Sequence, residues 1–132
     1  MRISIDLSGD SLHRRGYRQD GGMAPLKENL AAALLIRAGW PELANQGAPL
    51  IDPMCGSGTL VLEAAGIAAG RAPGYNRKRW GFEGWLGHDS AIWKKLLSEA
   101  REAQSIQPSM TLLGSDIDKK AIRFSKGNAM KM

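Results

Sequence analysis

Residues 49–59 read PLIDPMCGSGT and decide the fold. Residues 49–52 form a short apolar run, Gly56 and Gly58 follow in a turn, and residues 59–68 are apolar on almost every side. This succession is typical of a buried strand that passes through a tight turn into a buried helix. We therefore predict a strand, a glycine-rich turn and a helix in this part of the chain.

A similar succession ends the chain. Residues 110–113 form a second short apolar run before Gly114-Ser115-Asp116, and Asp118 stands where it can cap a final amphipathic helix. Between the two runs, Asp89 or Ser90 can cap another helix. Because strands that alternate with helices form βαβ units, we predict an α/β chain with a parallel sheet.

The remaining segments give weaker patterns. Residues 2–7 alternate apolar and polar side chains, which predicts a strand and one arm of a hairpin. Helical spacing after Pro25 predicts a helix at about residues 25–38, ended by Gly39. Residues 70–88, with five glycines, are interpreted as a long loop or insertion.

The glycine-rich turn is the first candidate site. Gly56 and Gly58 let the backbone approach a ligand at the carboxyl edge of the sheet, and the helix start presents amides that suit an anionic group. No Gly-Lys-Ser or Gly-Lys-Thr follows, and Val61 stands where a third glycine would be, which disfavours phosphate and dinucleotide binding. A strand-to-helix turn without a ligand is the alternative interpretation.

Asp116 is the second candidate, because it ends the second predicted strand. A carboxylate there can accept hydrogen bonds from both hydroxyls of a ribose. Its distance in sequence from Asp52 is longer than usual, and the insertion accounts for the excess. Since either Asp116 or Asp118 could simply cap the helix, we assign Asp116 to the ribose and Asp118 to the cap.

Other polar residues give little support for catalysis or metal binding. Cys55 lies inside the turn without a histidine beside it in sequence, so we interpret it as a small turn residue. Glu63 interrupts an apolar helix and is either an edge residue or a polar group aimed at the site. His13 and His88 are far apart, which makes a dedicated metal site unexpected.

Composition and charge narrow the class of protein. The chain is 43% hydrophobic and 23% charged, as in a soluble globular domain, and no apolar run approaches a membrane span. One cysteine and no signal-peptide pattern predict a cytoplasmic protein. A net charge of +5 favours a polyanionic partner. The cations form three clusters: Arg14, Arg15 and Arg18; Arg77, Lys78 and Arg79; and Lys119, Lys120, Arg123 and Lys126.

Two of these clusters adjoin aromatic residues. Residues 11–18 include Tyr17, and residues 77–82 mix cations with Trp80 and Phe82. Single-stranded RNA is bound by such mixtures, since bases stack on rings and phosphates pair with arginine. Either stretch could equally be a solvated loop.

The chain resembles a known family in a set of motifs that covers almost its whole length: DLSG at 6–9, SLHRRGYR at 11–18, APLKE at 24–28, DPMCGSGTL at 52–60 and RWGF at 79–82. It is similar to the THUMP-associated methyltransferases, and within them to the bacterial 23S ribosomal RNA guanine-N2 methyltransferases of the K/L type. The motif at 52–60 is specific for enzymes that use S-adenosylmethionine.

The resemblance implies the N-terminal part of a Rossmann-like sheet, incomplete in this chain, and methyl transfer to the exocyclic N2 amine of a guanine in 23S ribosomal RNA. Residues 1–24 would lead from an RNA-binding domain, and residues 25–132 would be the cofactor-binding half. The implied cofactor residues are Asp52, Pro53, Cys55, Gly56, Ser57, Gly58, Thr59 and Asp116. The expected RNA contacts are Arg14, Arg15, Arg18, Arg77, Lys78 and Arg79.

The chain departs from the family pattern in one decisive respect. The family's Asn-Pro-Pro-Tyr type segment, which grips the target amine, does not occur between residues 1 and 132. We therefore expect no catalytic residue here, no methylation by this chain alone, and activity in a longer parent protein. An adenine-N6 DNA methyltransferase and a non-catalytic RNA-binding module are the two rival functions.

Overall fold

The computed structural model describes residues 2–18, 26–104 and 110–132. Strands β1 (Leu50–Asp52) and β2 (Leu112–Gly114) form a parallel pair, with Leu50 opposite Leu112 and Asp52 opposite Gly114. The predicted α/β class and parallel sheet are confirmed. The helices of the described part are α1 (Glu28–Arg37), α2 (Trp40–Asn45), α3 (Thr59–Ala68), the 3-10 helix η1 (Gly81–Gly84), α4 (Ser90–Glu102) and α5 (Lys119–Ala129).

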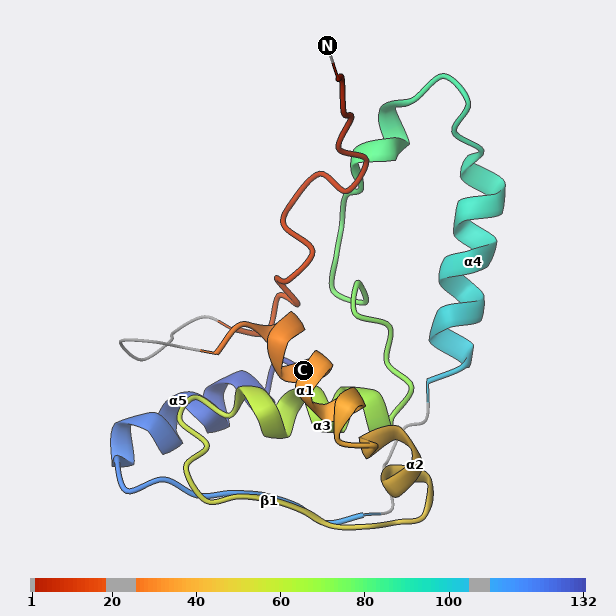
Figure 1. The fold of residues 1–132 in the computed structure, drawn as a ribbon. Coiled ribbons are helices and arrows are strands. Elements are labelled where there is room, and N and C mark those ends of the chain that lie inside the picture. Colours follow the sequence, from red (N-terminus) through yellow and green to blue (C-terminus); the bar gives the residue numbers. More distant parts are fainter. Residues whose placement is uncertain (1, 19–25, 105–109) are drawn as a thin grey trace.

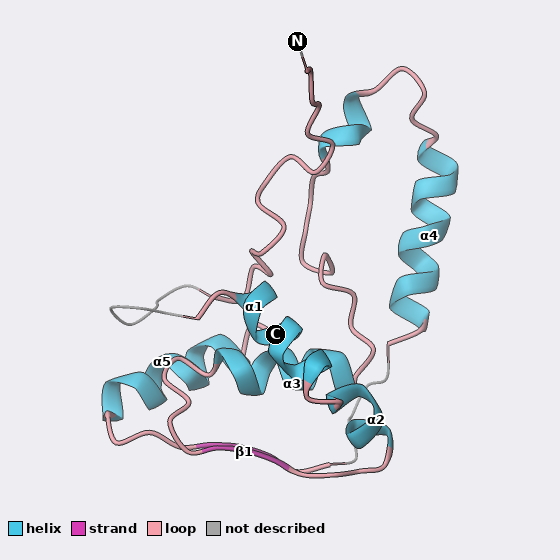
Figure 2. Ribbon diagram, viewed as in Figure 1, coloured by secondary structure: helices cyan, strands magenta, loops and turns pink. Residues whose placement is uncertain are grey.

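Helices α1, α3 and α5 lie on the same side of the two strands (Figures 1 and 2). On the strands themselves, the side chains of Ile51 and Leu113 are 64% and 52% exposed. The described part of the chain therefore covers one face of the sheet only, whereas a parallel sheet is normally covered on both. Asp52 and Gly114 end the two strands side by side, and the candidate site begins at this edge.

The core lies between α1, α2 and α3. Leu35, Trp40, Ala44 and Ala64 are buried against one another, and the Trp40 indole donates a 2.9 Å hydrogen bond to the carbonyl of Ala64. Sequence patterns missed α2, because Gly39 and Pro41 indicated only the end of the preceding helix. Gly39 adopts φ +76°, and Pro41 then stands at the start of α2, where a proline is tolerated.

The predicted strand at residues 2–7 is wrong. These residues have no strand partner in the structure, and Ile3 and Ile5 are 74% and 66% exposed. An extended segment needs a neighbouring strand for its backbone hydrogen bonds, and none of the described segments supplies one. The helix expected at 25–38 is confirmed as Glu28–Arg37, while its expected first residue lies outside the described part.

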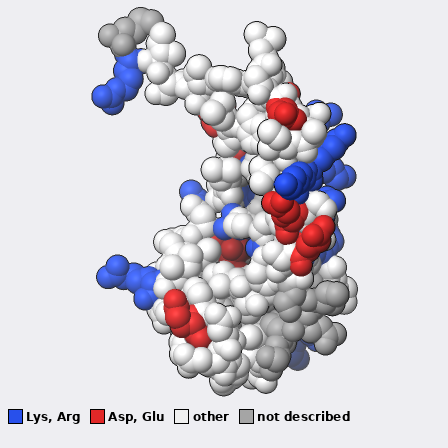
Figure 3. Space-filling model, turned by 90° about the vertical axis from the view of Figure 1, so that its right-hand side faces the viewer, with Lys and Arg blue, Asp and Glu red and all other residues white. Residues whose placement is uncertain are grey.

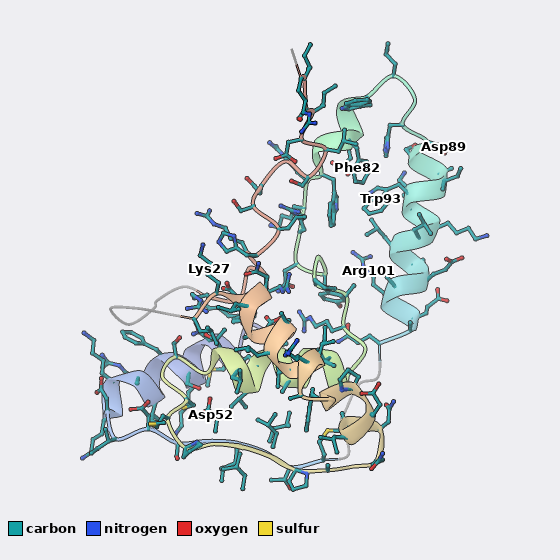
Figure 4. The ribbon with its side chains drawn as sticks, viewed as in Figure 1. Lys27, Asp52, Phe82, Asp89, Trp93 and Arg101 are labelled. Atoms are coloured by element: carbon teal, nitrogen blue, oxygen red, sulfur yellow. The ribbon has the colours of Figure 1, made fainter. Side chains whose placement is uncertain are left out.

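The insertion at 70–88 is mostly loop, as expected, and contains η1. Of the two predicted cap candidates, Asp89 caps α4, because its side chain accepts hydrogen bonds from the amides of Ala91 and Ile92. Helix α4 stands beside the segment 71–80 and away from the sheet (Figure 1). Trp93 of α4 and Phe82 approach each other edge to face, with ring centroids 4.9 Å apart (Figure 4).

Candidate functional site

The turn after β1 is held against the end of β2 by the backbone. The amide of Ser115 donates to the carbonyl of Asp52 over 2.9 Å, and the amide of Cys55 donates to the carbonyl of Ser115 over 2.8 Å. The carboxylate of Asp52 accepts from the amide of Met54 over 3.1 Å. These bonds fix residues 52–58, here named the glycine loop, as one rigid unit with the end of β2.

Two glycines of the loop have positive φ, but a side chain at each would meet different surroundings. Gly56 has φ +54°, and a Cβ built there would meet nothing within 4 Å, so this side of the loop is open. Gly58 has φ +83°, and a Cβ there would overlap the hydroxyl of Ser125 on α5. We expected Gly58 to admit a ligand, but its closest neighbour is α5. Of the two, Gly56 alone faces open space.

Asp116 joins the glycine loop to the turn before α5. Its Oδ2 accepts from the amide of Gly56 over 2.9 Å, and its Oδ1 accepts from the amide of Asp118 over 2.9 Å. These backbone donors lower the pKa of the Asp116 carboxyl, so it is ionised at neutral pH. Asp118 caps α5 by accepting from the amide of Lys120, which confirms the predicted cap.

Helix α5 closes the other side of the loop. The buried side chain of Asn128 donates to the carbonyl of Ser57 over 3.0 Å. Cys55 is buried, and its pKa is raised by burial and by the nearby carboxylates Asp52 and Asp116. A raised pKa keeps the thiol protonated, which agrees with a turn residue and not with a nucleophile.

A second polar cluster lies across α3. Glu63 is buried and accepts from the hydroxyl of Tyr17 over 3.0 Å and from Nε of Arg15 over 3.3 Å. The edge position expected as one alternative for Glu63 is wrong, because its partners hold it in the interior, and neither partner belongs to the glycine loop. Burial and the Glu63 carboxylate raise the pKa of Tyr17, so this phenol stays a hydrogen-bond donor.

Arg18 ties the same N-terminal segment to the start of α3. Its Nη2 donates to the hydroxyl of Thr59 over 2.7 Å and to the carbonyl of Leu26 over 2.6 Å, and its Nε donates to Glu28 over 2.9 Å. The side chains of Arg18 and Glu28 are only 15% and 8% exposed. Thr59 and Glu63 lie one turn apart on α3, so residues 15–18 bind along one face of this helix.

The structure keeps the predicted cofactor residues together but divides the arginine cluster at residues 14–18. It brings the predicted cofactor residues, which are residues 52–59 without Met54, and Asp116 together at the end of the two strands. It gives Arg15 and Arg18 carboxylate partners inside the chain, while Arg14 is exposed. Sequence reasoning missed the structural roles of Tyr17, Glu28 and Asn128. The one sequence signal for Glu28 and Asn128 is that each is a polar residue at a position where the helical pattern predicts burial.

Glu63 makes stability depend on pH. Burial raises the pKa of Glu63 above 4.5, its ordinary value, in spite of Arg15 and Tyr17, which lower it. Between the unfolded and folded pKa values the folded chain binds more protons, so its free energy of unfolding falls as pH rises through that window. We expect the free energy of unfolding of wild type minus that of Glu63→Gln, both from urea unfolding, to fall as pH rises above 4.5. A difference that grows with pH would contradict the pKa direction.

The helices of the described part are all too short or too polar to cross a membrane. Among the same residues there is also no cluster of three or more histidine, cysteine or carboxylate side chains that could hold a metal ion.

A βα unit whose rigid glycine loop meets an ionised aspartate at the end of the next parallel strand defines the class of Rossmann-like domains that bind a nucleoside-containing ligand. The comparisons with known proteins agree with this class. The chain belongs to the RMKL-like methyltransferase domain family (UPF0020), whose model matches residues 15–132.

Curated relatives match nearly the whole chain. The ribosomal RNA large subunit methyltransferases K/L of Syntrophotalea carbinolica and Methylococcus capsulatus are 58% and 57% identical to it, each over 96% of the chain. The chain spans 18% and 17% of the length of these relatives.

Solved structures share the fold. SMU.472, described as a methyltransferase in complex with S-adenosylhomocysteine (SAH), is 37% identical with a TM-score of 0.83 over 95% of this chain and 31% of its own. A protein from Listeria monocytogenes described as a predicted N6-adenine-specific DNA methylase is 39% identical with a TM-score of 0.82 over 95% of this chain and 32% of its own. The Rossmann-like methyltransferase fold expected from the resemblance is confirmed.

Proposed function

We propose that this chain is the cofactor-binding half of a longer K/L-type ribosomal RNA methyltransferase, here named the parent protein, and that the glycine loop holds S-adenosylmethionine. The single observation that carries the proposal is the join between the glycine loop and Asp116. An ionised carboxylate at the end of β2 lies within hydrogen-bond distance of the open, side-chain-free position at Gly56.

The residues present fit this cofactor. The Asp116 carboxylate has further acceptor capacity beyond its two backbone donors, as two ribose hydroxyls require. Open space beside Gly56 admits the ligand close to the backbone. The bound cofactor supplies an electrophilic methyl group. The chain's part is to fix position, through the backbone ties between β1 and β2 and through Asn128 on the loop.

We propose that the acceptor is the N2 amine of a guanine in 23S ribosomal RNA, in the cytoplasm. The names of the K/L relatives support an RNA acceptor, and the net charge of +5 suits a polyanion. We further propose that residues 1–24 lead from an RNA-binding domain and residues 25–132 form the cofactor half. The group that grips the acceptor amine would come from the rest of the parent protein.

The proposed RNA contacts are revised by the geometry. Arg14, Lys78 and Arg79 are exposed and keep the role expected from the sequence. Arg77 donates to the carbonyl of Asp10 and stacks on Trp80 at 4.8 Å, which orients it. Arg15 and Arg18 are assigned to the interior, because releasing them to a phosphate would leave Glu63 and Glu28 buried without their cationic partners.

The test uses the parent protein, labelled S-adenosylmethionine and unmodified ribosomal RNA. We expect N2-methylguanosine in the digested product, measured by mass analysis of nucleosides, and no transfer by residues 1–132 alone. N6-methyladenosine, or transfer to DNA in place of RNA, would support the function named for the Listeria protein. If S-adenosylmethionine did not stabilise the folded protein at all, the non-catalytic RNA-binding module would be the function that remains.

A further inference from the structure

A cavity lies away from the glycine loop, between α4 and the segment 71–80. It measures about 490 Å³, and we name it the arginine groove. One wall is the inner face of α4, from Trp93 to Arg101, and the other is the stretch from Ala72 to Trp80. The glycine loop contributes no residue to its lining, whereas two of the proposed RNA contacts, Arg14 and Arg77, do.

The charge of the groove is one-sided. Arg14, Arg77 and Arg101 line it beside Arg15, which is paired with Glu63, and no Asp or Glu occurs among the described residues of its lining. The outer surface near α4 is different, because cations and carboxylates mix there (Figure 3). Lys95 and Glu99, for example, approach to 3.8 Å on the outside of the helix. The groove therefore selects for an anionic ligand, whereas the outer face of α4 does not.

Three aromatic rings, those of Tyr75, Trp80 and Trp93, stand among the aliphatic side chains of the lining. Trp80 and Trp93 meet edge to face at 5.3 Å, which fixes both indoles in the wall. Tyr75 remains 40% exposed, and the guanidinium of Arg71 lies 4.3 Å from its ring centroid. An exposed ring held by a cation, beside fixed indoles, offers a platform on which a planar base can stack.

We propose that the arginine groove binds a single-stranded segment of the RNA substrate, with a base stacked on Tyr75 and neighbouring phosphates paired with Arg77 and Arg101. Rings alone would suit any apolar partner, and cations alone any polyanion. Nucleic acid is the ligand that brings planar bases and regularly spaced anionic charge together. This inference rests on the proposed function, since it names where an RNA acceptor is held beyond the glycine loop.

Two variants with matched controls test the groove in the parent protein, with a fluorescent single-stranded oligoribonucleotide of about ten nucleotides as the probe. Tyr75→Ala should weaken binding roughly tenfold, and Tyr75→Phe, which keeps the ring, should restore it. Arg101→Gln should weaken binding and flatten its salt dependence by one phosphate contact. Lys94→Gln removes the same charge from an exposed position of α4 outside the groove and should change little.

Equal affinity for wild type and Tyr75→Ala, or equal losses for Arg101→Gln and Lys94→Gln, would overturn the proposal. So would protection of Tyr75 from chemical labelling in the RNA-free parent protein, because another protein segment would then occupy the groove. Oligonucleotide binding is measured without S-adenosylmethionine, so it is independent of methyl transfer. If the parent protein transfers methyl groups to RNA but the groove variants bind the oligonucleotide as wild type does, the groove proposal alone is rejected. If the parent protein transfers no methyl group, the proposed function is rejected.

Discussion

Gly58→Ala is expected to destabilise the glycine loop more than any other single-methyl addition in it. The substitution forces a side chain into φ +83° and drives its Cβ into the hydroxyl of Ser125. A left-handed conformation costs roughly 1 to 2 kcal/mol and overpacking adds a similar amount, so we expect a loss of about 3 kcal/mol in the free energy of unfolding. Cofactor affinity, measured by calorimetric titration, should fall with it.

Gly56→Ala is the matched control, because Gly56 also has positive φ but open space around its Cβ. It should cost about 1 to 2 kcal/mol, the strain of the backbone alone. Ser125→Ala removes the overlapping hydroxyl, so the double variant Gly58→Ala, Ser125→Ala should recover part of the lost stability. If Gly58→Ala cost no more than Gly56→Ala, the contact between the loop and α5 would not be what requires glycine.

Arg18→Met is expected to lower the free energy of unfolding by about 3 kcal/mol, because it leaves the Glu28 carboxylate buried without its partner. It also removes the hydrogen bond to Thr59 at the start of α3, next to the glycine loop. Urea unfolding of the chain measures the first effect, and calorimetric titration with S-adenosylmethionine measures the second. The free energy of unfolding and the affinity for S-adenosylmethionine should both decrease in this variant.

Arg14→Met separates the interior role from RNA binding. Arg14 is exposed, so its loss should change stability by no more than about 0.5 kcal/mol. In the parent protein it should weaken RNA binding, whereas Arg18→Met should act mainly on folding. The opposite pattern, with a stable Arg18→Met variant that loses RNA affinity, would return Arg18 to the RNA surface.

The fold was predictable where the chain carries its own local signals. Asp89 and Asp118 cap helices with side chains that bond to amides two or three residues away, so their roles could be read from spacing. The strand predicted at residues 2–7 failed for the opposite reason. Alternation indicates which residues could form a strand, but the strand also needs a partner, and its partner is not encoded in the segment itself.

The candidate site divides in the same way. The glycine loop and Asp116 were identified because each stands directly after a strand, and parallel pairing then brings them together. Arg15 and Arg18 were assigned to RNA because a cluster of cations has the same composition whether it faces solvent or buried acids. Their partners, Glu63 and Glu28, lie 48 and 10 residues further along the chain, and only the folded structure shows that they meet.

The central claim is that S-adenosylmethionine lies on the glycine loop and Asp116. Amide hydrogen exchange with and without the cofactor tests it most directly, because it reports each backbone segment separately. We predict slower exchange with the cofactor in residues 52–59 and 114–118, with residues 71–80 and α4 unchanged. Cofactor-dependent protection confined to 71–80 and α4, or saturating binding without protection of 52–59, would contradict the site.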